Sequence, residues 1–337
     1  MFVEFKHGNS ADPFVEEDGS FPKIFNTTCA TRGQLVLYAT RQQSYQFRTW
    51  IISVGIFGNV ARLFRWDRTG CLVTAPINYS STQGNQQLTE FFLRLDLMAN
   101  KPESRGWDTT VKNPTAWEIN RFEAAIRMAC KGESQPAEGV TTRSQKEAQV
   151  QNKIFGQVYS RLAKSVGDRR KYARRKVSVP NGKVVKKYIV GLPISIPKSP
   201  IGRATRGFVA LSDEGKLVFL KDSWRPDVES IKPEDYWYGK FSSEKPAEGK
   251  RYVGAFSHGS DVYATKKLVK RQNKDQGKRQ ETVTHHYAGD PKHLVGDMMG
   301  YVHHRVVLGK LYLPLESFRN SKHLICVMRD VSLGGFP

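Results

Sequence analysis

Lys221 and Glu234 are the two residues whose types and spacing most directly suggest chemistry. Lys221 follows the apolar run 217–220, and Glu234 comes 13 residues later. Pro233, a residue favoured in the first turn of a helix, directly precedes Glu234. A lysine on a strand becomes a fixed cation for phosphate groups when a carboxylate on a neighbouring helix holds it in place. The spacing therefore predicts an ion pair between the Lys221 ammonium and the Glu234 carboxylate.

A glycine- and arginine-rich segment, SPIGRATRGF, precedes the strand of Lys221. Gly202 and Gly207 permit close approach of the backbone to a ligand, and Arg203 and Arg206 add positive charge. We interpret the segment as a candidate loop over phosphates. Ordinary interpretations stay open: a lysine that reaches water from a strand end, a simple turn, and a first-turn acid favoured by the helix dipole.

The composition indicates a folded and strongly basic chain. It has 337 residues, of which 39% are hydrophobic, and a formal net charge of +21. This length favours one to three domains. The positive excess is concentrated in 168–187 and 265–280. Basic runs of this kind favour nucleic acid or anionic surfaces, or act as nuclear import signals, although a solvated linker explains them equally well.

The chain carries no sign of export or membrane insertion. It contains no run of about 18 or more apolar residues. Its first 20 residues lack a basic start followed by an apolar stretch. The cysteines are far apart and form no metal-type pair, which indicates reduced thiols. We therefore expect an intracellular protein, in the cytoplasm or the nucleus, with no membrane partner.

The order of strand and helix patterns predicts an α+β fold. Residues 1–25 are polar and indicate a flexible arm. We expect an accessory domain of antiparallel strands and helices over 26–166, which opens with a three-stranded meander at 45–77. A basic linker over 167–187, punctuated by Pro and Gly, separates it from a second domain over 188–332.

Helical periodicity and capping signals locate the helices, and apolar runs between turn residues locate the later strands. Thr115 and Glu118, three residues apart, form a capping box. We expect helices at 85–99, 114–130, 146–166, 232–241 and 321–331. We expect strands within 188–197, 206–222 and 303–318. Asp213, Glu214 and Gly215 are predicted to form a hairpin turn within the second of these strand segments.

Segments spread along most of the chain resemble the fungal-type protein kinase family. The resemblance covers roughly 26–130 and 188–330, and RWDRTG and LKDSWR are its most distinctive parts. The similar segments are RGQLVLYATRQQSYQFRTWIISVGIFGNVARLFRWDRTGCLVTAPINY, FFLRLD, RGWDTTV, SPIGRATRGF, VFLKDSWRP, PEDYWYGKF, HGSDV and HHRVVLGKLYLPLESFRNSKHLI. The resemblance implies an accessory region followed by a protein-kinase-like small lobe, with a five-stranded antiparallel sheet and one main helix.

The resemblance also implies roles for individual residues. Lys221 would anchor the phosphates of ATP, with Glu234 as its ion-pair partner. The segment 308–313 would be the hinge that contacts adenine through backbone groups. The implied nucleotide-binding residues are Lys221, Glu234, Gly202, Arg203, Gly207, Leu308, Gly309, Lys310 and Leu311.

The residues that such a kinase uses for phosphoryl transfer are not recognisable in this chain. An active kinase needs an aspartate for the substrate hydroxyl, and an asparagine and a second aspartate for magnesium. The segment 329–332 resembles the catalytic loop, but Met328 and Gly335 stand where histidine and asparagine are required. Two helices, about 40 residues, must precede that loop, whereas Lys310 to Asp330 leaves room for one. We therefore expect no catalytic residue and no magnesium site, with Asp330 an ordinary helix residue.

These observations favour a truncated, catalytically inactive kinase-like protein that lacks the large lobe and binds ATP weakly. Its orphaned lobe surface would expose apolar side chains and favour a protein partner or self-association. The alternative is a basic nucleic-acid-binding or nuclear interaction protein that acts through 168–187 and 265–280. A longer product with a complete catalytic region is a third possibility.

Two further groups of polar residues have side chains that could serve other chemistry. The pairs His285–His286 and His303–His304 are adjacent, and neighbours on a strand face opposite ways, so neither pair forms a metal site by itself. A nuclease-like cluster of carboxylates is conceivable, and it would comprise Asp67, Asp96, Asp108 and Glu90. Asp67 lies in a turn signal, however, and turn formation explains this residue well.

Overall fold

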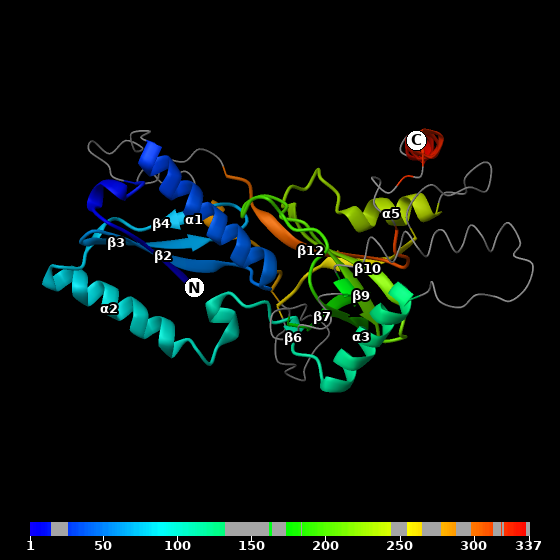
Figure 1. The fold of residues 1–337 in the computed structure, drawn as a ribbon, viewed down its shortest axis with the longest axis horizontal. Helices are drawn as coiled ribbons and strands as arrows, with labels where there is room; N and C mark the ends of the chain where they lie inside the picture. The colour runs from blue at the N-terminus through cyan, green and yellow to red at the C-terminus, as the bar shows by residue number, and fades with distance from the viewer. Residues whose placement is uncertain are drawn as a thin grey trace, which may run out of the picture.

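The computed structural model has the expected α+β architecture, built from two sheets with helices packed against them. It describes residues 1–14, 26–131, 162–163, 173–182, 184–243, 255–264, 278–287, 298–312, 318 and 320–334. Figure 1 shows the two sheets next to each other along the long axis, with α1 and α2 on the first sheet and α3 and α5 on the second. No helix in the described part of the chain is long and apolar enough to cross a membrane.

The first sheet has the strand order β1-β2-β3-β4, with β5 also paired to β3. Its strands are β1 (Phe2–Lys6), β2 (Ile51–Phe57), β3 (Val60–Trp66), β4 (Cys71–Val73) and β5 (Ile77–Asn78). The predicted meander is confirmed, because β2, β3 and β4 pair antiparallel. Gly58 takes a φ of 58° in the β2–β3 turn, a conformation that glycine adopts without strain.

Helices α1 (Asn26–Tyr45) and α2 (Thr82–Leu97) flank the first sheet. Leu35 and Ala39 of α1 pack with Ile51, Phe57 and Phe64 in a fully buried apolar core. α2 lies beside β5 and begins at an N-cap, where the Ser81 side chain accepts the Gly84 N–H.

The prediction of a flexible arm over 1–25 is wrong for residues 1–14, the part of this range that the structure describes. Phe2–Lys6 forms β1 and pairs parallel to β2. Asp12 is buried and accepts a 2.7 Å hydrogen bond from Nε of Arg62, a buried residue of β3. An arginine on an inner strand position needs a counter-charge, and the polar N-terminal segment supplies it. Residues 15–25 lie outside the described residues.

The second sheet has seven strands, in the order β11-β12-β10-β9-β8-β7-β6, where the sequence led us to expect five. Its strands are β6 (Val111–Lys112), β7 (Arg175–Asn181), β8 (Val184–Val190), β9 (Arg206–Ser212), β10 (Leu217–Pro226), β11 (Phe256–Asp261) and β12 (Tyr301–Leu308). All of its ladders are antiparallel, and the predicted turn 213–215 joins β9 to β10.

The basic segment expected as a linker over 167–187 instead supplies strand β7 and most of β8. Val177 and Val179 of β7 are both fully buried, while Lys176, Ser178 and Pro180 beside them are only half-buried. The alternation was present in the sequence, but the basic residues concealed it. β6 comes from the range predicted as the accessory domain, so segments on both sides of the expected boundary build one sheet.

The second sheet is strongly curled, because β11 and β7 approach each other across its inner face. An apolar core fills one end of that inner face; it contains Val177, Tyr188, Phe208, Leu220 and Val307. The outer face is covered by α3 (Ala116–Lys131), whose Phe122 and Ile126 pack on β8 and β9. α5 (Glu234–Ser243) lies over the same outer face beside β11.

The remaining helices agree with the sequence where the structure describes them. The capping box of α3 is confirmed, since Thr115 N–H donates to Glu118 and Glu118 N–H donates to Thr115. α6 (Ser321–Gly334) closes the described chain and includes Asp330. Of the helix predicted at 146–166, only 162–163 are described. The basic segment 265–277 also lies outside the described residues.

Candidate functional site

The predicted ion pair between Lys221 and Glu234 is present. Lys221 lies on β10, which has β9 on one side and β12 on the other, and it faces Gly207 and Val306 across the ladders. Glu234 is the first residue of α5, and its Oε2 lies 2.5 Å from Lys221 Nζ. The two side chains are 25% and 23% exposed. The pair is thus held in place and still open to solvent.

Arg203 adds a second cation to this pair. Its Nη2 lies 3.7 Å from the same Glu234 Oε2, and its side chain is 60% exposed. Two cations therefore share one carboxylate, which leaves one positive charge in excess within this group of three side chains. A local excess of positive charge beside solvent favours an anionic ligand.

The two glycines predicted to approach phosphates already have backbone partners. The Gly202 N–H donates to the Arg68 carbonyl at 2.7 Å. Gly207 lies inside β9 instead of a loop, and its N–H donates to the Ser195 carbonyl at 3.2 Å. An amide can cradle a phosphate only when its N–H is free. At this site the side chains of Lys221 and Arg203 are the available donors.

The predicted hinge residues lie where β12 ends. Leu308 is the last residue of β12 and faces Phe219, two positions before Lys221 on the same side of β10. The Gly309 N–H donates to the Ala255 carbonyl at 2.7 Å. Lys310 is exposed, and Leu311 packs against the outer apolar cluster around Phe122. Their contact with an adenine ring stays a prediction.

Asp222, the acid directly after Lys221, faces the opposite side of the sheet, because consecutive strand residues alternate. Its carboxylate meets the groups that close the inner face; these are Arg206 Nη2 at 3.2 Å, Arg305 Nε at 3.0 Å and His303 Nε2 at 3.0 Å. Burial alone would raise the pKa of Asp222, but Arg206, His303 and Arg305 hold it well below its ordinary value.

Arg305 is the centre of this inner network, with 0% exposure. It binds Asp222 through Nε and Asp108 Oδ2 through Nη2, at 3.0 and 2.5 Å. Its Nη1 donates to Thr110 Oγ1 and to the Ser178 carbonyl. Since each guanidinium nitrogen of Arg305 has an acceptor, the network closes one end of the curled sheet without an exposed reactive group. It serves packing rather than ligand binding.

The conceivable nuclease-like cluster does not form. Asp108 is bound to Arg305, and Asp67 accepts the backbone N–H groups of Val283 and Thr284. Glu90 pairs with Arg94 on the exposed side of α2. Among the residues that the structure describes, no group of three or more His, Cys, Asp or Glu side chains could hold a metal ion.

A second charged network, which sequence reasoning missed, lies on the outer face next to Lys221. Arg225 grips Asp261 with two hydrogen bonds, at 2.8 and 2.6 Å. His304 lies between Asp261, at 3.0 Å, and Asp235 of α5, at 3.3 Å. Burial alone would lower the pKa of His304, but these two carboxylates raise it. The contact with Asp235 helps to seat α5, and therefore Glu234, on the sheet.

The alternation of polar residues in LKDSWR and HHRVV was the available signal for both networks. As predicted, the neighbours His303 and His304 face opposite sides of β12, towards Asp222 and Asp261 respectively. The sequence could not reveal those acids as partners, because Asp222 and His303 are 81 residues apart.

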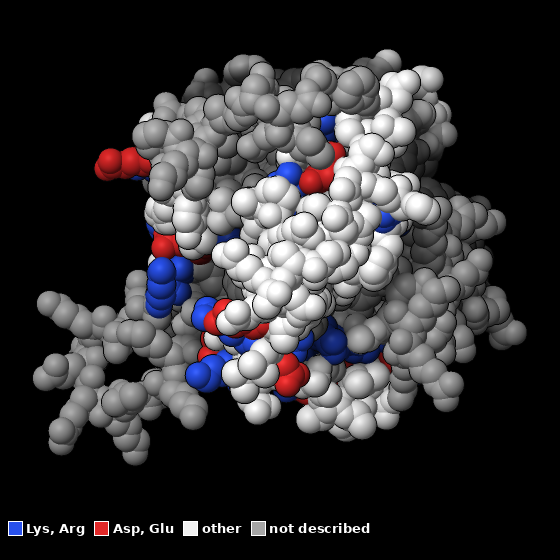
Figure 2. All heavy atoms as spheres, turned by 90° about the vertical axis from the view of Figure 1, so that its left-hand side faces the viewer, with Lys and Arg blue, Asp and Glu red and all other residues white. Residues whose placement is uncertain are grey.

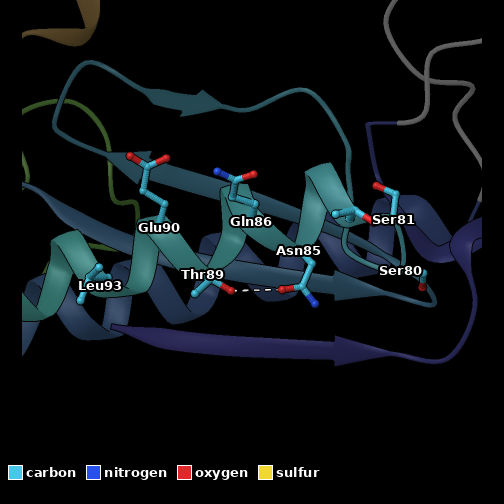
Figure 3. A pocket seen from close by; sticks show the side chains of 8 residues that line it. Ser80, Ser81, Asn85, Gln86, Thr89, Glu90 and Leu93 are labelled. Atoms are coloured by element: carbon cyan, nitrogen blue, oxygen red, sulfur yellow. Dashed lines mark hydrogen bonds between the residues drawn. The ribbon is translucent and has the colours of Figure 1, made fainter.

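Two hollows lie away from Lys221. One is an open, polar depression of about 710 Å³ along α2, and Figure 3 shows its lining side chains, including Asn85, Gln86 and Glu90. The other, of about 400 Å³, lies between the end of α1 and the second sheet and is lined in part by Tyr45, Phe47 and Arg206. Lys221 lines neither hollow, so the Lys221 site is distinct from both.

Figure 2 views the end of the molecule formed by the first sheet, where blue and red patches lie close together among neutral atoms.

The chain was also compared with known proteins. No family model, no curated protein and no solved structure matches it. The resemblance to fungal-type protein kinases and the roles it implies therefore stay predictions, and the case for function depends on the geometry around Lys221.

Proposed function

We propose that the outer face of the second sheet is a kinase-like half-site that binds the phosphates of a nucleotide such as ATP, without phosphoryl transfer. The observation that carries the proposal is the 2.5 Å pair between Lys221 Nζ and Glu234 Oε2. A lysine on an inner strand, held by a carboxylate of a packed helix, is the arrangement that fixes a cation for nucleotide phosphates.

Two further features support this proposal. Arg203 brings a second cation to the pair from the segment 191–205, so that these three side chains together carry one net positive charge. The contact between His304 of β12 and Asp235 of α5 holds α5 against the sheet, and therefore keeps Glu234 beside Lys221. Both contacts are made by side chains, in keeping with the occupied amides of Gly202 and Gly207.

A binding titration with ATP tests the proposal. We expect the unmodified chain to bind ATP and the Lys221→Met variant to bind at least about tenfold more weakly, because a charge-assisted contact is lost. Lys216→Met is the matched control, since Lys216 lies in the turn between β9 and β10, is exposed and pairs with Glu214. Equal affinities of the Lys221→Met variant and the unmodified chain, or no ATP binding by either, would overturn the proposal.

Salt dependence distinguishes this function from nucleic-acid binding. Binding through many phosphate contacts falls steeply as salt rises, roughly in proportion to the number of phosphates neutralised. Affinity for a nucleic-acid duplex that is strong, steeply salt-dependent and unchanged by Lys221→Met would favour the basic segments 168–187 and 265–280 as the functional part.

A further inference from the structure

The turn 67–70 between β3 and β4 is where the first sheet meets the loops of the second. Asp67 is buried, and its Oδ2 accepts the N–H groups of Val283 and Thr284, each at 3.0 Å. Its Oδ1 accepts the Thr69 N–H at 2.9 Å and closes the turn. The Thr69 hydroxyl lies 2.7 Å from that of Thr282. The turn is therefore fixed against the second half of the molecule.

Arg68, at the centre of this turn, holds the segment 191–205 at two points. Its Nη1 donates to the Pro200 carbonyl at 3.0 Å and to Gln43 Oε1 at 2.7 Å. Its own carbonyl accepts the Gly202 N–H at 2.7 Å. One residue of the first sheet thus fixes both positions that lead into Arg203.

Arg68 is an unusual residue to bury. It is 1% exposed, and no carboxylate of the described residues lies within ion-pair distance of it. Burial, and then the charge of Arg206, lower the pKa of Arg68 to about 9. A buried guanidinium without a carboxylate in contact is costly. The hydrogen bonds to Gln43 and Pro200, together with the more distant charges of Asp222 and Asp67, offset that cost.

The segment beyond Gly202 is held from the other side and is strained. The Arg203 carbonyl accepts the Trp224 N–H of β10 at 2.8 Å. Ala204 has a φ of 40°, and it is the only residue other than glycine with a positive φ in the described part of the chain. Such backbone strain persists only where the surroundings over-determine the conformation. Arg68 and Trp224 supply that constraint on either side of Arg203.

We propose that Arg68 is a positioning residue for the Lys221 site. Its hydrogen bonds to Pro200 and Gly202 hold the segment that places Arg203 beside Glu234. Through this contact, the first sheet sets the affinity of the second sheet for a polyphosphate anion. The inference rests on the proposed function. It also supplies a physical reason for the two sheets to share one chain.

A double-mutant cycle with ATP as the probe tests this role. Arg68→Gln keeps a donor but removes the guanidinium, and Arg203→Gln removes the positioned cation. We expect each single variant to weaken ATP binding about three- to fivefold, and the double variant to bind no more weakly than either one. Arg94→Gln is the control, because its exposed ion pair lies on α2, away from the contact. Independent, additive losses would overturn the inference.

Amide hydrogen exchange measures the same contact without a ligand. We expect Arg68→Gln to accelerate exchange at the Gly202 amide and to leave the amides of β2 unchanged. Unchanged exchange at Gly202 would overturn the inference alone. An unmodified chain that fails to bind ATP would overturn the proposed function and the effect of Arg68 on affinity together.

Gly202→Ala provides a second route if Arg68→Gln does not fold. Gly202 has a φ of 82°, which an alanine does not readily adopt, and its Cβ position meets open space. This substitution disturbs the segment while every buried side chain stays intact. We expect the loss of ATP affinity seen with Arg203→Gln, with little change in thermal midpoint. Full ATP affinity in Gly202→Ala would contradict the inference.

Discussion

The two faces of β10 carry similar charged residues in very different surroundings. On the outer face, Lys221 and Arg225 pair with acids of α5 and β11 while part of each side chain meets solvent. On the inner face, Asp222 is enclosed with Arg206 and Arg305. An exposed pair costs little to break and is free to exchange its partner for a ligand. A buried pair cannot do so, because losing one partner leaves a charge without solvent.

Arg305→Met should have the largest effect on this comparison. It leaves Asp108 and Asp222 buried with less compensation, and we expect a loss of about 3–5 kcal/mol in the free energy of unfolding, measured by denaturant titration. Arg279→Met, which removes a partly exposed pair with Asp227, should cost less than about 1 kcal/mol. Similar losses for both variants would erase the distinction between the faces.

The histidines sharpen the comparison through pH. His258 lies on the inner face beside Tyr188, and burial, with Lys186 nearby, lowers its pKa to about 4. A folded-state pKa below the unfolded value means that the unfolded chain binds the proton first. The stabilisation is present above about pH 6.5 and is lost as the pH falls towards 4, by up to about 1.4 kcal/mol per pH unit for one proton.

His304 on the outer face should behave in the opposite way. Because Asp235 and Asp261 raise its pKa, its stabilisation is complete below the unfolded pKa and is lost as the pH rises through the folded value. Unfolding titrations across pH should therefore show a flatter acid limb in His258→Gln and a flatter neutral-to-alkaline limb in His304→Gln. Identical profiles for the two variants would contradict the assignment.

Lys221→Met should have the smallest effect on stability. The pair with Glu234 is about one-quarter exposed, so we expect the free energy of unfolding to change by less than about 1 kcal/mol. The same variant is expected to lose ATP affinity, which separates a site available to a ligand from the closed network behind it. A decrease of several kcal/mol in the free energy of unfolding would instead show that Lys221 stabilises the fold, as the inner network around Arg305 does.

The locally specified parts of the fold were predictable. The meander of β2, β3 and β4 was readable from its apolar strands and turn residues, as was the hairpin turn at Gly215, which takes a φ of 83°. The Lys221–Glu234 pair was predictable for the same reason, because a strand residue and the first residue of the next helix lie only 13 residues apart, although β10 continues past Lys221 to Pro226.

The strand partners of distant segments were not predictable. β1 joins the first sheet by pairing parallel to β2, and β6 joins the second sheet through β7. The basic residues of 175–187 concealed two strands, since their charge dominated the composition while their apolar neighbours filled the core. The role of RWDRTG as a contact between the sheets also had no local signal, as Arg68 and Pro200 are 132 residues apart.

The sequence by itself determined the meander of β2, β3 and β4, the turn at Gly215 and the meeting of Lys221 with Glu234, because these outcomes depend on neighbours along the chain. Only the tertiary structure decided that Asp222 would be buried while Lys221 stayed open, and that Arg68 would reach Pro200. The physical reason is that charge is tolerated inside a protein only where a partner is present. Those partners came from segments that only the folded chain brings together, with Asp108 and Arg305 separated by 197 residues.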